Sequence, residues 1–133
     1  MINKLQRPVK FIAVGASGVG VNLLLLYLLT DIAGVHYAAS AFVAIEASII
    51  TNFLLNDRWT FKDRRGSKVF SRLLKYNAVS GAGVGVNMGI MALLVEVGGL
   101  HYLMAEFLAI LGAFVWNYTL SSRYVWSKRF ANV

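Results

Sequence analysis

Two short segments of the sequence place an arginine among aromatic, hydroxyl and amide side chains. The first reads Asn56-Asp57-Arg58-Trp59-Thr60-Phe61, and the second reads Ser121-Ser122-Arg123-Tyr124-Val125-Trp126. A guanidinium group binds phosphate through paired hydrogen bonds, and Trp and Tyr rings favour the boundary between water and lipid. The segments therefore suit an anionic phosphate at a membrane surface, bound by Arg58 and Arg123 with Trp59 and Trp126 beside them. Snorkelling arginines and interfacial anchoring explain the same residues without a ligand, and the sequence leaves both interpretations open.

Amide and carboxyl side chains precede these segments within long apolar runs. Ser48, Asn52 and Asn56 are spaced four residues apart, so they share one face of a helix. Glu46 lies about 16 Å from the end of its run, near the bilayer centre, where an ionised carboxylate is costly. The alternatives are hydrogen bonds between helices, such as Glu46 with Asn22, or a path for a polar headgroup. The residues that would line such a path are Asn22, Glu46, Asn52, Asn56, Asn87 and Asn117.

The sequence offers little for catalysis or metal binding. It contains no Cys, which excludes thiolate chemistry, and its two His residues, His36 and His101, begin apolar runs, where interfacial anchoring explains them. The Gly-rich segments 15–20 and 81–85 lack the spacing of a phosphate loop, but such small residues let helices approach closely in lipid. We expect no enzyme activity, no metal site and no cofactor. We expect Glu106, near the start of its run, to face outward within reach of water.

The composition indicates a protein whose solvent is lipid. Of 133 residues, 58% are hydrophobic and only 14% are charged, whereas soluble domains have about 25% charged residues. Four runs, residues 11–30, 32–56, 76–95 and 97–122, contain at most one charged residue inside the apolar part and are long enough to cross the hydrocarbon core. The sequence therefore predicts an all-α membrane protein with four transmembrane helices in a single domain, residues 1–133.

The chain also aligns with itself at an offset of 65 residues. Residues 10–61 then match residues 75–126 without a gap, and the identical pairs include Gly18 with Gly83 and Asn52 with Asn117. The segment 62–74 is left as a basic connecting loop. Each repeat holds two spans, so we predict two helical hairpins with the same orientation in the membrane.

The placement of the basic residues predicts the topology. All 13 Lys and Arg residues lie before the first run, between the second and third, or after the fourth, and they give a net charge of +7. The positive-inside rule then puts both termini and the loop in the cytoplasm, where the charges face anionic lipids, and nucleic acid is excluded as a partner. Residues 67–76 have apolar and basic faces, which predicts a separate amphipathic helix on the membrane surface.

Taken together, these features resemble the GtrA-like family of small bacterial membrane proteins. The resemblance covers about residues 8–130. It rests on the glycines and Asn22 of the first run, on the segment from Asn52 to Phe61, and on Asn87 in the third run. It also rests on Asn117, near the end of the fourth run, and on the segment from Ser122 to Trp126 that follows. It implies a protein of the bacterial inner membrane that moves a polyprenyl-phosphate-linked monosaccharide from the cytoplasmic to the outer leaflet for polysaccharide synthesis.

Two other functions remain open at this stage. The protein is either that flippase, with the phosphate on Arg58 and Arg123, or a membrane anchor that recruits a glycosyltransferase through its basic loop. A proton-coupled exporter built on Glu46 is a third alternative. Four helices enclose little interior, so we expect a homodimer.

Overall fold

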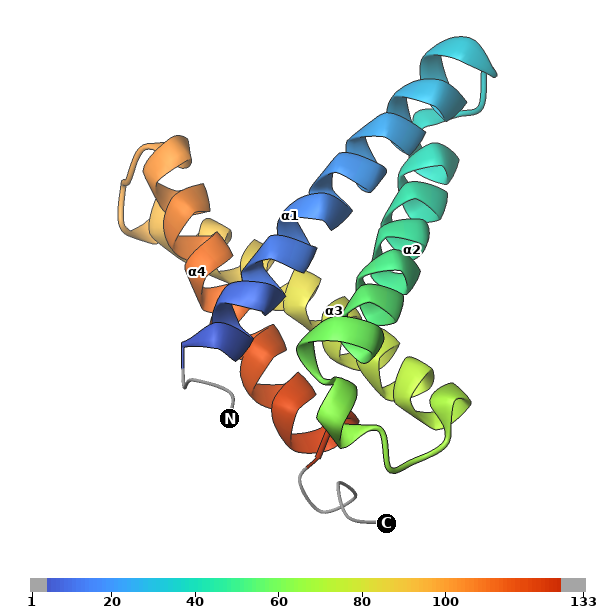
Figure 1. The fold of residues 1–133 in the computed structure, drawn as a ribbon. Helices are drawn as coiled ribbons and strands as arrows, with labels where there is room; N and C mark the ends of the chain where they lie inside the picture. Colours follow the sequence, from blue (N-terminus) through green and yellow to red (C-terminus); the bar gives the residue numbers. More distant parts are fainter. Residues whose placement is uncertain (1–4, 128–133) are drawn as a thin grey trace. The chain divides into compact units, whose positions relative to one another are not determined.

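The computed structural model describes residues 5–127, and every regular element in this range is helical (Figure 1). The long helices are α1 (Gln6–Tyr27), α2 (Tyr37–Leu55), α3 (Val69–Ala92) and α4 (Tyr102–Leu120). Each continues into a π-helical turn, and the four turns are η1 (Leu28–Ile32), η2 (Asn56–Thr60), η4 (Leu93–Val97) and η5 (Ser121–Val125). A short 3-10 helix, η3 (Lys62–Arg64), follows η2.

All four helices with their turns are long and apolar enough to cross a membrane. A helix satisfies its backbone polar groups internally, which is what a segment in lipid requires. The predicted fold class, an all-α membrane protein with four spans, is therefore confirmed, and the chain is a multi-pass membrane protein. The orientation of the spans and the predicted repeats stay predictions. Of the basic residues that define that orientation, Lys4, Lys128 and Arg129 lie outside the described residues.

The chain divides into two compact units, Met1–Arg65 and Gly66–Val133. In the first unit α1 packs along α2, and in the second α3 packs along α4 (Figure 1). Each unit is thus a helical hairpin, with one predicted repeat inside it. We call the end of each hairpin that carries Arg58 or Arg123 its basic end.

A stripe of buried residues runs along each helix and packs it against its neighbour. On α1 the stripe is Arg7, Phe11, Val14 and Gly18, at the three- and four-residue spacing of one helix face. At Gly18 the amide group of Asn52 from α2 occupies the space that a Cβ would need. The amide of Asn117 does the same at Gly83 in the second unit. Glycine is therefore required at both crossings because any side chain there would collide with an asparagine.

The turns opposite the basic ends also match between the units. Gly34 and Gly99 adopt φ values of +73° and +68°, a conformation that glycine reaches without strain and that ends the preceding helix. The imidazole Nδ1 of His36 then accepts a hydrogen bond from the backbone N–H of Ala38, 3.2 Å away, and caps α2. His101 caps α4 in the same way. Capping is a role that the sequence analysis did not assign to these histidines.

The prediction of a separate surface helix over residues 67–76 is wrong. From Val69 onward these residues form the first turns of α3, which continues without interruption into the membrane-spanning part. The segment contains no Gly or Pro that would break the helix, and Arg72 and Tyr76 are buried on the same stripe as Ser80 and Gly83. The apolar face predicted for a surface helix, with Phe70 and Leu74, stays exposed, and it is Arg72 that is buried in the hairpin; α3 thus begins inside the predicted loop 62–74.

The glycine crossings make a direct stability prediction. Gly18→Ala forces Asn52 or the helix backbone to move, and overpacking of this kind costs about 1–3 kcal/mol. Gly20→Ala is the matched control because a Cβ at Gly20 has no neighbour within 4 Å. We expect thermal unfolding in detergent to occur at lower temperature for Gly18→Ala and at the wild-type temperature or above for Gly20→Ala.

The double variant Gly18→Ala with Asn52→Ala tests the cause. If Asn52 is the obstacle, removing its amide restores part of the lost stability, so the two changes are strongly non-additive. Equal destabilisation by Gly18→Ala and Gly20→Ala would show that the crossing does not depend on glycine.

Candidate functional site

The basic end of the first unit presents Arg58 and Trp59 on the π-helical turn η2. Both side chains are exposed, Trp59 to 46%. The backbone N–H of Phe61 closes the turn on the carbonyl of Asn56 at 2.8 Å. Lys10 of α1 places its Nζ 5.3 Å from the centre of the Trp59 ring, a cation–π contact. Lys10 and Trp59 thus meet from α1 and η2, and Arg58 is exposed on the same turn as Trp59.

A second arginine, Arg7, lies behind this surface and is buried. Its guanidinium donates to both carboxylate oxygens of Asp63, at 3.0 and 2.9 Å, and to the backbone carbonyl of Thr60 at 3.2 Å. It also lies 5.1 Å from the centre of the Phe61 ring, which packs edge-on against Phe11. Arg7 therefore ties the start of α1 to the end of η2 and fixes the turn that carries Arg58.

Sequence reasoning missed Arg7, although a signal was present. Arg7 and Arg72 are 65 residues apart, like the pairs of the predicted repeat, and each precedes its lysine by three residues. In the second unit Arg72 is also buried, and its guanidinium donates to the backbone carbonyl of Ser67. The matching burial indicates that both arginines are structural.

The ion pair affects the acid–base behaviour of Asp63. The hydrogen bonds from Arg7 hold the pKa of this carboxyl below its ordinary value, although partial burial opposes the change. The Asp63 side chain is 46% exposed, so water screens much of the attraction. The pair therefore matters more for fixing geometry than for raw stability.

The second unit carries a related surface on η5. Arg123 and Tyr124 are exposed, Tyr124 to 58%, at the positions that match Arg58 and Trp59. Trp126 is fully buried, and its ring centre lies 5.4 Å from that of Tyr76. Trp126 matches Phe61 rather than Trp59, so Tyr124 is the aromatic residue that stands beside Arg123 at the surface.

Polar atoms without a partner lie farther along the same helices. The Oδ1 atoms of Asn52 and Asn117 and the Oγ of Ser121 are buried and accept no hydrogen bond within residues 5–127. Asn56, by contrast, is buried and satisfied because the Thr60 hydroxyl donates to its Oδ1 at 2.7 Å. Buried hydrogen-bond acceptors are normally paired. A ligand that donates hydrogen bonds would supply a partner for the two asparagine oxygens.

The remaining predicted site residues lie closer to the middle of the helices. Asn22 and Glu46 are half-buried on α1 and α2, and a hydrogen bond between them stays a prediction. In the second unit Asn87 of α3 donates to Glu106 of α4 at 3.2 Å. Glu106 is half-buried and accepts this hydrogen bond, and the expectation that its carboxyl faces outward within reach of water stays a prediction.

The described residues contain no group of three or more His, Asp or Glu side chains that could hold a metal ion. The polar side chains of the predicted site are amides, hydroxyls, guanidinium groups and an ammonium group, together with the carboxyl group of Glu46. Guanidinium and ammonium groups bind phosphate oxygens, and amides and hydroxyls form hydrogen bonds with other hydroxyls. The arrangement is thus suited to recognising a phosphorylated, hydroxyl-bearing ligand.

The Arg7–Asp63 pair predicts a dependence of stability on pH. Because the pKa of Asp63 is lowered in the folded protein, its contribution is present above the ordinary aspartate pKa of about 3.9 and is lost as the pH falls through the lowered value. We expect Asp63→Asn to lower stability by about 1 kcal/mol at pH 7, as for a partly exposed ion pair. Thermal unfolding at pH 7 and at pH 3 measures this difference, which shrinks on acidification.

Glu96→Gln is the control because it removes an exposed carboxylate that makes no such pair. It leaves the unfolding temperature near that of the wild type at pH 7. A difference between Asp63→Asn and wild type that persists unchanged in acid would contradict an ionic contribution.

Comparison with known proteins identifies the family of the chain. A family model described as GtrA/DPMS, transmembrane domain, matches residues 10–126. The chain is also 37% identical over 124 residues to a dolichol-phosphate mannosyltransferase of Pyrococcus furiosus, and the match covers 93% of this chain and 35% of that protein. The chain thus spans about a third of the length of this relative. It belongs to the GtrA/DPMS transmembrane-domain family of membrane proteins.

Proposed function

We propose that the protein is a flippase that carries a polyprenyl-phosphate-linked monosaccharide from the cytoplasmic to the outer leaflet. One observation carries the proposal. In both units an exposed arginine on a π-helical turn is followed, deeper in the same hairpin, by a buried amide oxygen with no partner in residues 5–127. A lipid with a phosphate and a hydroxyl-bearing sugar needs this order of groups.

The phosphate would be bound at the basic ends. Arg58 offers a guanidinium and Lys10 an ammonium, and Trp59 offers a ring at the level of the lipid headgroups. Arg123 and Tyr124 play this part in the second unit. Trp126, fully buried on Tyr76, would support the position of η5 rather than contact the lipid.

The sugar would travel along the polar atoms of the helices. Asn52 and Asn117 lie six residues before Arg58 and Arg123, about 9 Å deeper along a helix. Their free oxygens accept hydrogen bonds, and sugar hydroxyls donate them. Asn22, Glu46 and Asn87 extend the polar path, whereas Asn56 supports η2 through Thr60.

The proposed transport direction requires a particular orientation of the protein in the membrane. The basic ends face the cytoplasm of a bacterial cell, where the inner leaflet is anionic and the positive-inside rule places Lys and Arg. We further propose a homodimer, because the four helices of a single chain enclose little interior for a headgroup.

Reconstitution into liposomes tests the flippase. Vesicles carry dolichyl-phosphate mannose in both leaflets, and external periodate, which does not cross the bilayer, oxidises the sugars that it reaches. With wild-type protein we expect the shielded sugars to become accessible, whereas in empty vesicles they stay shielded. Loss of a charge-assisted hydrogen bond costs about 1.5–3 kcal/mol, so Arg58→Ala with Arg123→Ala slows exposure at least about tenfold.

Lys62→Ala with Lys68→Ala is the matched control. It removes two exposed positive charges between the hairpins but leaves both π-helical turns intact. We expect this variant to expose the sugars at the wild-type rate. Transport no faster than in empty vesicles, or an equal rate for both double variants, contradicts the proposal.

A second function has its own support. The relative named as a mannosyltransferase is about three times as long as this chain, so most of that protein lies outside the match. The chain therefore serves as an anchor for a separate glycosyltransferase if it does not move lipid itself, and catalysis would belong to that partner. In that case the Lys62 and Lys68 variant loses the partner in a pull-down while the variant of Arg58 and Arg123 retains it.

A further inference from the structure

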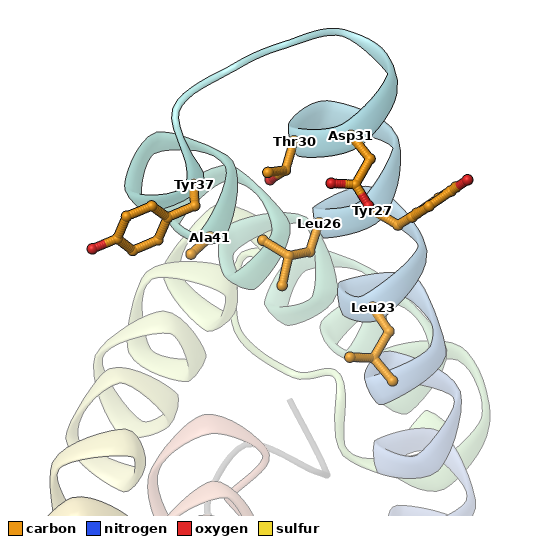
Figure 2. Close-up of a pocket in the computed structure, with 7 residues that line it drawn as sticks. All are labelled: Leu23, Leu26, Tyr27, Thr30, Asp31, Tyr37 and Ala41. Carbon is orange, nitrogen blue, oxygen red and sulfur yellow. The ribbon is translucent and has the colours of Figure 1, made fainter.

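A pocket of about 410 Å³ lies in the first unit, at the end opposite the basic residues (Figure 2). It is formed by the end of α1, the turn η1 and the start of α2. Leu26 occupies its centre, with Tyr27 from one helix and Tyr37 from the other on its two sides (Figure 2). The lining residues are Leu23, Leu26, Tyr27, Thr30, Asp31, Tyr37 and Ala41.

The pocket changes from polar to apolar along its length. Thr30 and Asp31 lie near the turn, whereas Leu23 lies deeper by eight residues, about 12 Å along the helix. The Oγ1 of Thr30 is buried and has no hydrogen-bond partner within the described residues, and the Asp31 carboxylate is exposed. Two hydrogen-bond acceptors thus stand at the rim above a floor of Leu23, Leu26 and Ala41.

The second unit provides an internal comparison. The residues 65 positions after Tyr27, Thr30 and Ala41 are Ala92, Val95 and Glu106, so one tyrosine and the hydroxyl are missing there. A glutamate replaces the alanine of the pocket floor, and its carboxylate is held by Asn87. The combination of a rim hydroxyl and a small residue at the floor therefore belongs to the first unit.

We infer that this pocket receives the sugar end of the polyprenyl lipid at the outer leaflet, an inference that rests on the proposed flippase function. Sugar hydroxyls donate to Asp31 and Thr30. The first isoprene units lie on Leu23, Leu26 and Ala41. An ordinary phospholipid tail fills the floor equally well, so the groups at the rim have to provide any preference for the sugar.

The charge at this end also suits release. Asp31 attracts hydroxyl donors but repels a phosphate, whereas Arg58 and Lys10 at the basic end attract it. The lipid is therefore held by its sugar and its first isoprene units, without an ionic contact to the phosphate. A site of this kind binds weakly enough to pass the lipid on to the outer leaflet.

Photolabelling tests the pocket directly. The probe is dolichyl-phosphate mannose with a diazirine in its first isoprene unit, and the comparison probe is dolichyl phosphate with the same diazirine and no sugar. Proteoliposomes are irradiated and the labelled peptides identified by mass spectrometry. We expect labelling of the Leu23–Tyr27 and Tyr37–Ala41 peptides to be about fivefold stronger with the mannosyl probe, the effect of roughly one hydrogen bond.

Thr30→Val is the decisive variant because it places in the first unit the residue that the second unit carries at Val95. It is nearly isosteric, and we expect it to remove the preference for the mannosyl probe while the unfolding temperature is kept. Val95→Thr is the control and leaves labelling unchanged. Ala41→Phe fills the floor and lowers labelling by both probes.

The outcomes separate the pocket from the flippase. Equal labelling by the two probes, or no labelling of these peptides, overturns the inference even if periodate shows that the sugars cross the bilayer. Selective labelling that Thr30→Val abolishes supports it. If selective labelling occurs without any transport, the flippase proposal is wrong while the pocket stands as a binding site for the lipid-linked sugar.

Discussion

In each hairpin an asparagine amide lies directly on the backbone of a glycine, and the packing of the hairpin depends on this contact. Lipid gives two apolar helices no hydrophobic reason to associate, so close approach at small residues has to hold them together. The contact has a cost, because the oxygens of Asn52 and Asn117 accept no hydrogen bond within residues 5–127. Leaving a buried acceptor unpaired costs about 1–3 kcal/mol, and an apolar residue of similar size would avoid that cost. The unpaired oxygens at the two crossings are the observation on which the proposed contact with the sugar rests.

The basic end of the first unit divides two tasks between two arginines. Arg7 is buried with Asp63, the Thr60 carbonyl and the Phe61 ring, and it makes the end of η2 rigid. Arg58, on the same turn, is left exposed. A π-helical turn shifts the register of the side chains that follow it, which is one reason such turns occur at functional sites. The buried arginine thus positions the exposed one, although only the exposed one is free to meet a ligand.

Features that depend on the composition of long segments, such as the four spans, could be predicted from the sequence. Features that depend on local backbone geometry could not. Four spans follow from long runs without charge, because a charged residue in lipid is costly. The arginines at the ends of these runs stand out for the same reason. Periodicity, however, did not show that residues 67–76 are continuous with the next span, because an amphipathic face has the same spacing in a separate surface helix as in the first turns of a longer one. The π-helical turns, the capping histidines and the Arg7–Asp63 pair require coordinates, since no residue type specifies them.

The two hairpins agree at their basic ends and differ at their opposite ends, and this difference bears on how a flippase works. Arg58 and Arg123 match, whereas Thr30 and Ala41 correspond to Val95 and Glu106. On the proposed function, both units meet the same phosphate on entry, but only one has to present the sugar for release. Unequal affinity at the basic end and at the opposite end determines which of the two sites the bound lipid occupies more often. It does not change the equilibrium distribution of the lipid between the two leaflets. Net movement then follows from synthesis of the lipid on one side and its consumption on the other, so the protein needs only to lower the barrier for a polar headgroup.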